Sequence, residues 1–422
     1  MEKRPKVSVI MKCYNHEKFV GEAIESVLNQ TYRDFEFLVA DNGSTDRSGE
    51  IINSYADRIK VFKMEQNDPA ECELMLWREA VGDYVAVICS DDWWEETKLE
   101  KQMEAAERMP ECEFFFTWAR VAEGDLSNVI DSERFVLYNA EKKKWFRTLF
   151  EKGTCFEASS ILSKNNGCYI ETFKPGGLKY RQLPDWASYF EMILNRKVYV
   201  VEEYLMKRRN HGNNVSVPNV QNVKRSMSED ANIRRYFLER VPDDVFVESF
   251  SENLTSRLDR NDPVDIMCNK IIYFISYAKN KWWLGQSALE FCWDHYGDRG
   301  VMEMLESKYD FTWQKLQDLS GEIGIGGLMQ YERAKQENAG VSEEIRACIC
   351  KLINMIAIIE ARAEIPSLVV TIMETIFRLK VECDFDSAIY CYKLAMVINA
   401  SDADEVWEDM RASLMKVLYI SK

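Results

Sequence analysis

The chain has 422 residues, of which 46% are hydrophobic and 29% charged, and its formal net charge at pH 7 is -16. This length and composition are typical of a globular protein with more than one domain. Binding to a nucleic acid backbone requires a basic surface, so the acidic balance argues against a nucleic acid partner. A small phosphorylated ligand is compatible with it, because such a ligand needs only a local cation.

Nothing in the sequence predicts secretion or a membrane span. The first residues, MEKRPK, run directly into a strand-like segment. The apolar run LINMIAII at 352–359 is far shorter than the about 20 residues that cross a bilayer. The twelve cysteines are scattered, mostly in apolar runs, which is typical of reduced buried thiols. We therefore expect a cytoplasmic protein, with room for peripheral association with the inner face of the membrane.

Residues 7–113 alternate between the periods of strands and helices. Continuous apolar runs at 7–12, 35–40, 58–63 and 84–89 are typical of buried strands, and helical periods at 17–30 and 46–55 lie between them. Short apolar strands that alternate with amphipathic helices predict β-α-β units and a parallel sheet.

The rest of the chain predicts a mixed region and then helices. A strand at 114–121, a helix at 186–195 and a strand pair or one bent strand at 197–209 precede a polar stretch at 223–245, which predicts a linker. Sparse Gly and Pro favour an all-α domain over 246–422, with helices at 248–259, 264–279, 284–294, 300–318, 341–362, 365–380, 385–398 and 403–420. Residues 385–407, and more faintly 283–297, resemble half of a tetratricopeptide unit, but no fixed period is visible, so an irregular bundle is preferred.

Polar residues stand at the ends of three predicted strands. Tyr14 and Asn15 follow the first strand, Asp41 ends the second, and Asp91 and Asp92 end the fourth. Ligands of open parallel α/β sheets bind at the carboxyl ends of the strands. The sequence therefore predicts that these side chains converge on one crevice.

The adjacent acids Asp91 and Asp92 predict a cation site. Ionising both beside an apolar strand is costly without a counter-charge. Mn²⁺ or Mg²⁺ would supply that charge and favours carboxylates with phosphate oxygens. The alternative is a helix N-terminal turn, where the dipole favours acids. For Asp41 the alternative is helix capping, for which Ser44 and Thr45 are better placed.

Residues 5–217 resemble a family 2 glycosyltransferase with the GT-A fold, a Rossmann-like nucleotide-diphospho-sugar transferase fold. The segment SVIMKCYNHEKFVGEAIESVLNQTYRDFEFLVADNGSTD at 8–46 is similar to the opening of that family, and VGDYVAVICSDDWW at 81–94 to its acidic metal-binding segment. The resemblance implies a GT-A domain over 1–222 and a UDP-sugar donor. It also implies that Asp92 is a metal ligand and that the donor contacts Cys13, Tyr14, Asn15, Asp41 and Asp91.

Two later segments complete the implied site. In RQLPDWASYFEMI at 181–193, Asp185 aligns with the general base of the family, which implies direct displacement with inversion at the anomeric carbon. MKRRNHGNNVS at 206–216 resembles the closing segment, which implies that Arg209 or Arg208 meets the diphosphate and that His211 ligates the metal. The residues alone leave an alternative for each of these roles. Asp185 would instead cap the helix at 186–195, and His211 would lie in an exposed loop.

The chain departs from the family pattern at several positions. Cys89 stands where the first acid of an Asp-x-Asp-Asp segment is frequent, Lys12 replaces a common proline or threonine, and Pro184 replaces a glutamate. His16 and His295 receive no role beyond surface or packing.

The resemblance implies a metal-dependent, inverting hexosyl- or hexosaminyltransferase of polysaccharide biosynthesis. Its acceptor would be a saccharide, a glycolipid or a glycoprotein. The alternative is a catalytically inactive scaffold that keeps the GT-A fold while its helical domain binds a partner.

Overall fold

The computed structural model describes residues 4–124, 126–127, 129–131, 135–177, 179–211, 220–279 and 281–323. The predicted helices beyond 323, the apolar run at 352–359 and the segment at 385–407 lie outside these residues. The chain divides into two compact units, Met1–Tyr277 with Glu290–Tyr309, and Ala278–Leu289 with Asp310–Lys422.

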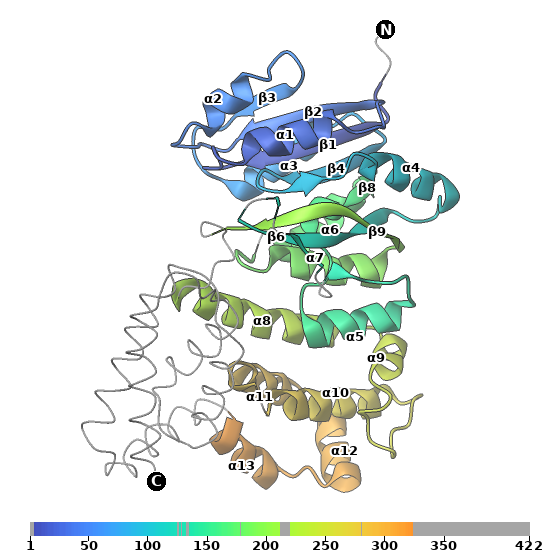
Figure 1. The fold of residues 1–422 in the computed structure, drawn as a ribbon. Helices are drawn as coiled ribbons and strands as arrows, with labels where there is room; N and C mark the ends of the chain where they lie inside the picture. Colours follow the sequence, from blue (N-terminus) through green and yellow to red (C-terminus); the bar gives the residue numbers. More distant parts are fainter. Residues whose placement is uncertain are drawn as a thin grey trace, which may run out of the picture. The chain divides into compact units, whose positions relative to one another are not determined.

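One mixed sheet of nine strands forms the centre of the first unit within the described residues (Figure 1). Its strands are β1 (Val7–Cys13), β2 (Phe35–Asp41), β3 (Lys60–Lys63), β4 (Tyr84–Cys89), β5 (Trp93–Trp94), β6 (Phe114–Glu123), β7 (Val129–Ile130), β8 (Leu162–Lys164) and β9 (Val198–Asn210). The order is β3-β2-β1-β4-β8-β6-β9-β5, and β7 pairs with β6.

The first four strands run parallel, as the sequence predicts, so their carboxyl ends share one edge. Cys13 at the end of β1 pairs with Asp41 at the end of β2, and Lys12 pairs with Cys89 at the end of β4. β8 is antiparallel to β4 and β6, whereas β9 is parallel to β6. The segment predicted at 197–209 is one strand, and two register shifts opposite Trp118 bend its pairing with β6.

The described helices are α1 (Val20–Leu28), α2 (Ser48–Asn53), α3 (Pro69–Glu79), α4 (Lys98–Arg108), α5 (Lys142–Lys152), α6 (Cys168–Gly177), α7 (Pro184–Asn195), α8 (Val220–Arg240), α9 (Asp243–Ser249), α10 (Pro263–Ala278), α11 (Trp282–Tyr296), α12 (Arg299–Tyr309) and α13 (Trp313–Ile323). Apolar residues at helical spacing build them: in α1, Val20, Ala23, Ile24 and Val27 are fully buried in the same core cluster as the strands. This arrangement is the expected α/β domain with a GT-A-like strand order, followed by helices.

Two of the predicted helices are wrong. The helix predicted at 248–259 is absent, because α9 ends at Ser249 and residues 250–262 form turns and loops. The helix predicted at 300–318 is broken into α12 and α13 at Asp310, whose φ of 51° lies in the left-handed region.

The predicted linker at 223–245 overlaps helix α8. Ile233, Phe237 and Leu238 of α8 are almost fully buried, and the Phe237 ring stacks on Phe190 of α7 at 4.5 Å between centroids. The many charged residues of this stretch therefore alternate with apolar residues that α8 buries. The domain bounds themselves stay a prediction.

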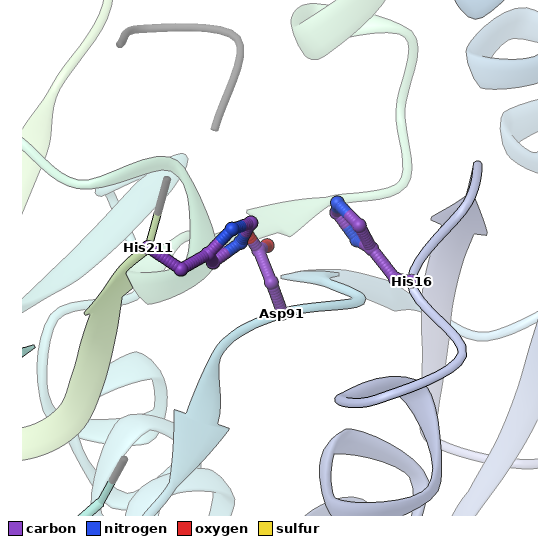
Figure 2. A group of neighbouring side chains, drawn as sticks. All are labelled: His16, Asp91 and His211. Atoms are coloured by element: carbon purple, nitrogen blue, oxygen red, sulfur yellow. The ribbon is translucent and has the colours of Figure 1, made fainter. Parts of the chain in front are cut away.

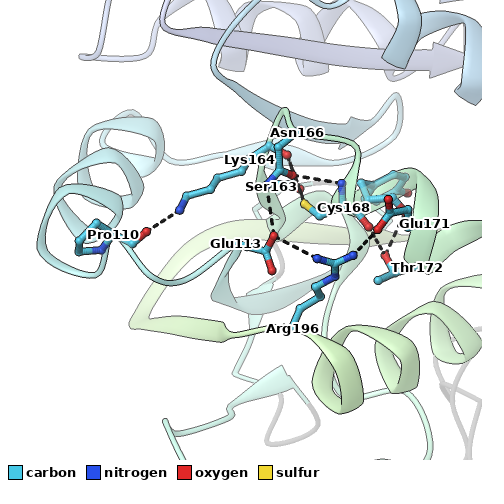
Figure 3. A network of polar contacts seen from close by, with 10 residues as sticks. Pro110, Glu113, Ser163, Lys164, Asn166, Cys168, Glu171, Thr172 and Arg196 are labelled. Atoms are coloured by element: carbon cyan, nitrogen blue, oxygen red, sulfur yellow. Dashed lines mark hydrogen bonds and ion pairs between the residues drawn. The ribbon is translucent and has the colours of Figure 1, made fainter.

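A polar network fixes the end of α7 against the sheet (Figure 3). The guanidinium of Arg196, directly after α7, lies 3.4 Å from Glu113 before β6 and also pairs with Glu171 of α6. Asn166 donates a second hydrogen bond to the Glu113 carboxylate at 3.2 Å. Because α7 carries Asp185 at its opposite end, this network helps to set the position of that carboxylate.

Within the part of the chain that the structure describes, no helix is both long enough and apolar enough to cross a bilayer.

Candidate functional site

Two loops at the ends of β1 and β2 hold each other in place. Asn15 adopts a φ of 55°, a left-handed conformation that asparagine tolerates better than most residues. Its side-chain oxygen accepts a hydrogen bond from the backbone N–H of Thr45 at 2.8 Å, and its own backbone N–H donates to Ser44 Oγ at 3.0 Å. The predicted donor-binding residue Asn15 therefore shapes the loop between β2 and α2.

Asp41 lies beneath this loop with only 6% of its surface exposed. Its Oδ1 accepts a hydrogen bond from the backbone N–H of Ser44 at 3.0 Å. A Cβ at Gly49 would stand 2.6 Å from Asp41 Oδ2, so only glycine permits this approach of helix α2. Nearby, Tyr14 is 40% exposed and offers a ring to a ligand, whereas the side chain of Cys13 is buried in the core.

The two neighbouring acids after β4 have different surroundings. Asp91 Oδ2 lies 3.1 Å from His211 Nε2. Burial alone would raise the pKa of Asp91, but the hydrogen bond to His211 and the charge of His16 lower it. The contact with His211 thus favours the ionised form of the Asp91 carboxyl.

The Asp92 carboxylate instead accepts hydrogen bonds from the surrounding chain. Its Oδ2 accepts a hydrogen bond from Ser159 Oγ, in the 3₁₀ turn Ala158–Ser160, and its Oδ1 accepts one from the backbone N–H of Arg209 at 3.0 Å. Burial, then the charges of Asp91 and Glu157, raise the pKa of Asp92 well above its usual range. Both acids belong to groups that could hold a metal ion, and the role of Asp92 as a cation ligand stays a prediction.

Arg209 is buried behind the acidic turn. Its Nε donates to the carbonyl oxygen of Asp91 at 2.9 Å, and its guanidinium pairs with Glu22 of α1 and lies 4.7 Å from the ring centre of Phe19. With 3% of its surface exposed, Arg209 holds β9, the turn after β4 and α1 together. Its predicted contact with a diphosphate stays a prediction, as does that of Arg208, which lies 3.5 Å from Glu157.

His16, Asp91 and His211 form one cluster, drawn in Figure 2. One ligand atom from each lies within 4.8 Å of the others. The ring centres of His16 and His211 are 5.6 Å apart, and Phe19 packs on the His211 ring at 4.4 Å. His16, for which the sequence predicts only surface or packing, directly follows Asn15 at the end of β1 and joins this cluster.

A second charged group surrounds the predicted base, Asp185, in the first turn of α7. Lys12 Nζ lies 2.6 Å from Glu73 Oε2, and Glu73 Oε1 accepts hydrogen bonds from Trp77 Nε1 at 3.2 Å and from the hydroxyl of Tyr169 at 3.1 Å. Burial raises the pKa of Asp185, and the charge of Lys12 opposes this. No pattern in the sequence marks Glu73 as a neighbour of Asp185.

The loop before α7 is held by a single carboxylate of α8. Glu229 accepts hydrogen bonds at 2.8–2.9 Å from three successive backbone N–H groups, those of Arg181, Gln182 and Leu183. Together with Pro184 at the first helical position, this fixes where Asp185 begins the helix. Among the described residues, none donates a hydrogen bond to the Asp185 carboxylate.

The donor set of the His16–Asp91–His211 cluster fits a divalent cation. It combines two imidazoles, which suit ions such as Zn²⁺ and Ni²⁺, with a carboxylate, which suits Mn²⁺ and Mg²⁺. A second group, Cys89 with Asp91 and Asp92, shares Asp91 with the first.

The comparisons with known proteins agree on one family. Residues 8–165 match the model described as Glycosyl transferase family 2. A Haemophilus influenzae protein named as an uncharacterized glycosyltransferase is 35% identical over 173 residues, which are 40% of this chain and 66% of that protein. The putative teichuronic acid biosynthesis glycosyltransferase TuaG of Bacillus subtilis is 38% identical over 119 residues, 27% of this chain and 46% of TuaG.

Among solved structures, S. aureus TarS 1-349 in complex with UDP-GlcNAc is similar with a TM-score of 0.45 and 16% identity, over 71% of this chain and 88% of that one. This chain spans 18% to 66% of the length of the first curated relatives that it matches. Residues 8–165 of this chain therefore belong to glycosyltransferase family 2.

Proposed function

We propose that this protein transfers a sugar from a nucleotide-sugar to a hydroxyl of an acceptor, in a reaction that depends on a divalent cation and inverts the anomeric configuration. A UDP-linked sugar is the proposed donor. The observation that carries the proposal is the 3.1 Å contact of His211 with Asp91, which belongs, like Asp41, to the family 2 domain.

Two groups of residues at the strand ends would bind different parts of the donor. Asp41, Asn15 and the exposed ring of Tyr14 would bind the base and ribose, since a buried carboxylate accepts hydrogen bonds and an aromatic face stacks on a base. Asp91 and His211 would hold the cation, which when bound would neutralise the diphosphate leaving group. In this assignment Asp92 and Arg209 keep the acidic turn in shape.

Asp185 would act as the general base. Its carboxylate would take the proton of the acceptor hydroxyl while that oxygen bonds to the anomeric carbon. The bond from this carbon to the diphosphate oxygen breaks, and its electron pair leaves with the diphosphate. A base whose pKa is raised by burial suits this task, because it accepts a proton more readily near neutral pH.

The acceptor is proposed only by class, as a growing polysaccharide, a lipid-linked saccharide or a glycoprotein. We also propose a cytoplasmic location, which the eight free cysteines of the described residues support, because thiols stay reduced there. The competing proposal is a scaffold that keeps the fold without turnover.

A screen of nucleotide-sugars for hydrolysis, with and without Mn²⁺, tests the function before any acceptor is known. We expect cation-dependent release of the nucleoside diphosphate from one donor. Asp91→Asn and Asp185→Asn should each reduce the rate by about 100-fold, the usual range for loss of an electrostatic or acid–base group.

Asp83→Asn is the matched control. Asp83 precedes the same strand β4 at its opposite end, where it pairs with Lys6 at 2.8 Å on the surface. This variant should keep the wild-type rate. Wild-type rates in both Asp91→Asn and Asp185→Asn, or no Mn²⁺-dependent binding of UDP in a titration, would instead support the scaffold.

A further inference from the structure

Asp91 is approached by histidines from two separate parts of the chain. His16 comes from the loop between β1 and α1, and His211 directly follows β9. Figure 2 shows both rings beside the Asp91 carboxylate, and the three ligand atoms lie within 4.8 Å of one another. The cluster therefore offers two ring nitrogens and one oxygen to the same small volume.

The separation of His211 and Asp91 is that of neighbouring ligands on one ion. Transition-metal bonds to nitrogen and oxygen are about 2.1 Å long, so two ligands at a right angle are about 3 Å apart. The separation between His211 Nε2 and Asp91 Oδ2 is 3.1 Å. A cation bound by both atoms would need no large rearrangement of either side chain.

His16 is held as a metal-binding histidine is usually held. Such a histidine donates its second ring N–H to a neighbouring oxygen, which fixes the ring. Nδ1 of His16 lies 2.8 Å from Ser90 Oγ, and the His16 backbone N–H donates to Ser48 Oγ at 2.8 Å. With Nδ1 bonded to Ser90, the Nε2 lone pair is the one left for a cation.

We propose that His16 is a third protein ligand of the cation and that it makes the site select imidazole-preferring transition metals over Mg²⁺. The catalytic use of the ion rests on the proposed function, but its binding does not. Mg²⁺ takes oxygen ligands almost exclusively, whereas imidazole suits Co²⁺, Ni²⁺ and Zn²⁺. Two nitrogens among three protein ligands therefore favour these ions, with Mn²⁺ between them and Mg²⁺ in affinity.

The test is a titration of the metal-free full chain with Co²⁺ in the absence of any nucleotide, followed by calorimetry and by the visible absorption of bound Co²⁺. We expect one Co²⁺ per chain that an equal concentration of Mg²⁺ does not displace. His16→Ala should weaken Co²⁺ binding at least 10-fold and change the absorption spectrum, because one nitrogen ligand is lost. His16→Gln, which keeps a polar side chain of similar length, repeats the test if the alanine variant folds poorly.

His295→Ala is the matched control. His295 also faces a carboxylate, that of Glu239 at 2.9 Å. Among the described residues, however, it has no second histidine beside it. It should bind Co²⁺ as the wild type does. Wild-type Co²⁺ affinity and spectrum in both His16 variants would overturn the proposal, as would the absence of Co²⁺ binding by the wild type.

The two proposals fail in different ways. If the wild type hydrolyses a nucleotide-sugar with Mn²⁺ while the His16 variants bind Co²⁺ normally, the function stands and His16 is no ligand. If the His16 variants lose Co²⁺ but no nucleotide-sugar is used, the cation site stands and the proposed function is wrong.

Discussion

Asp91 and Asp92 are neighbours in sequence and yet meet opposite surroundings. Asp91 faces two histidines, whereas Asp92 accepts hydrogen bonds from Ser159 and from the Arg209 backbone. The pattern of an apolar strand followed by two acids predicts a cation site but does not show that the two acids have different partners. That difference depends on the turn after β4 and on β9, which returns more than a hundred residues later.

The charges around Asp185 predict how activity depends on pH. Lys12 on β1, Glu73 on α3 and Arg208 on β9 are the charged groups that act on this carboxyl. Lys12 and Arg208 lower the pKa of Asp185 and Glu73 raises it, against the larger effect of burial. Since a general base works only when deprotonated, activity should fall as the pH drops through this pKa.

Lys12→Met and Glu73→Gln should therefore move the acidic limb of the kcat/KM profile in opposite directions. Loss of the Lys12 charge raises the pKa of Asp185 and shifts the limb to higher pH, whereas loss of the Glu73 charge shifts it to lower pH. The measurement is nucleotide-sugar hydrolysis from pH 4 to 9 at saturating cation. Limbs that coincide with that of the wild type in both variants would show that another group is the base.

Asp265 joins helices α10 and α12 within the first unit. It is fully buried and accepts hydrogen bonds from the backbone N–H of Asp259 at 2.5 Å, from Lys308 Nζ at 2.5 Å and from the hydroxyl of Tyr309. Burial alone would raise the pKa of Asp265, but these donors lower it. The folded state thus favours the charged carboxylate, which stabilises the protein above the ordinary aspartate pKa of about 4.

Asp265→Asn should lower the free energy of unfolding by about 2 kcal/mol at pH 7, since hydrogen bonds to a charged group are lost. The difference from the wild type should shrink as the pH falls below about 4, where the wild-type carboxylate also takes up a proton. Urea unfolding of the full chain at pH 7 and pH 3.5 measures both effects. Asp244→Asn in the exposed first turn of α9 is the control and should change stability by less than about 0.5 kcal/mol.

The predicted elements are most accurate where the apolar pattern is long and uninterrupted. The runs at 7–12, 35–40 and 84–89 correspond to β1, β2 and β4, because fully buried parallel strands are apolar throughout. The errors arise where local conformation decides. The left-handed backbone of Asp310 divides a continuous helical pattern, and no periodicity in the sequence marks it.

Across the first unit, the site combines segments that are predictable with contacts that are not. The sequence indicates that Tyr14, Asp41 and Asp91 share an edge, because parallel strands align their ends. It does not show that the rings of His16 and His211 lie side by side, with their centres 5.6 Å apart. The partnership of Lys12 with Glu73 joins β1 to α3, and only the packed structure shows it.

The position of β9 has a consequence for the order in which the protein is made. His211 follows Asp91 by 120 residues, so at about 5–20 residues per second it is synthesised on the order of ten seconds later. Until then the acidic turn lacks its hydrogen bond from the Arg209 backbone, and β5 and β6 lack the strand that pairs with both. The nascent chain therefore carries His16 and Asp91 without a second histidine, and the complete cluster first forms when β9 joins the sheet.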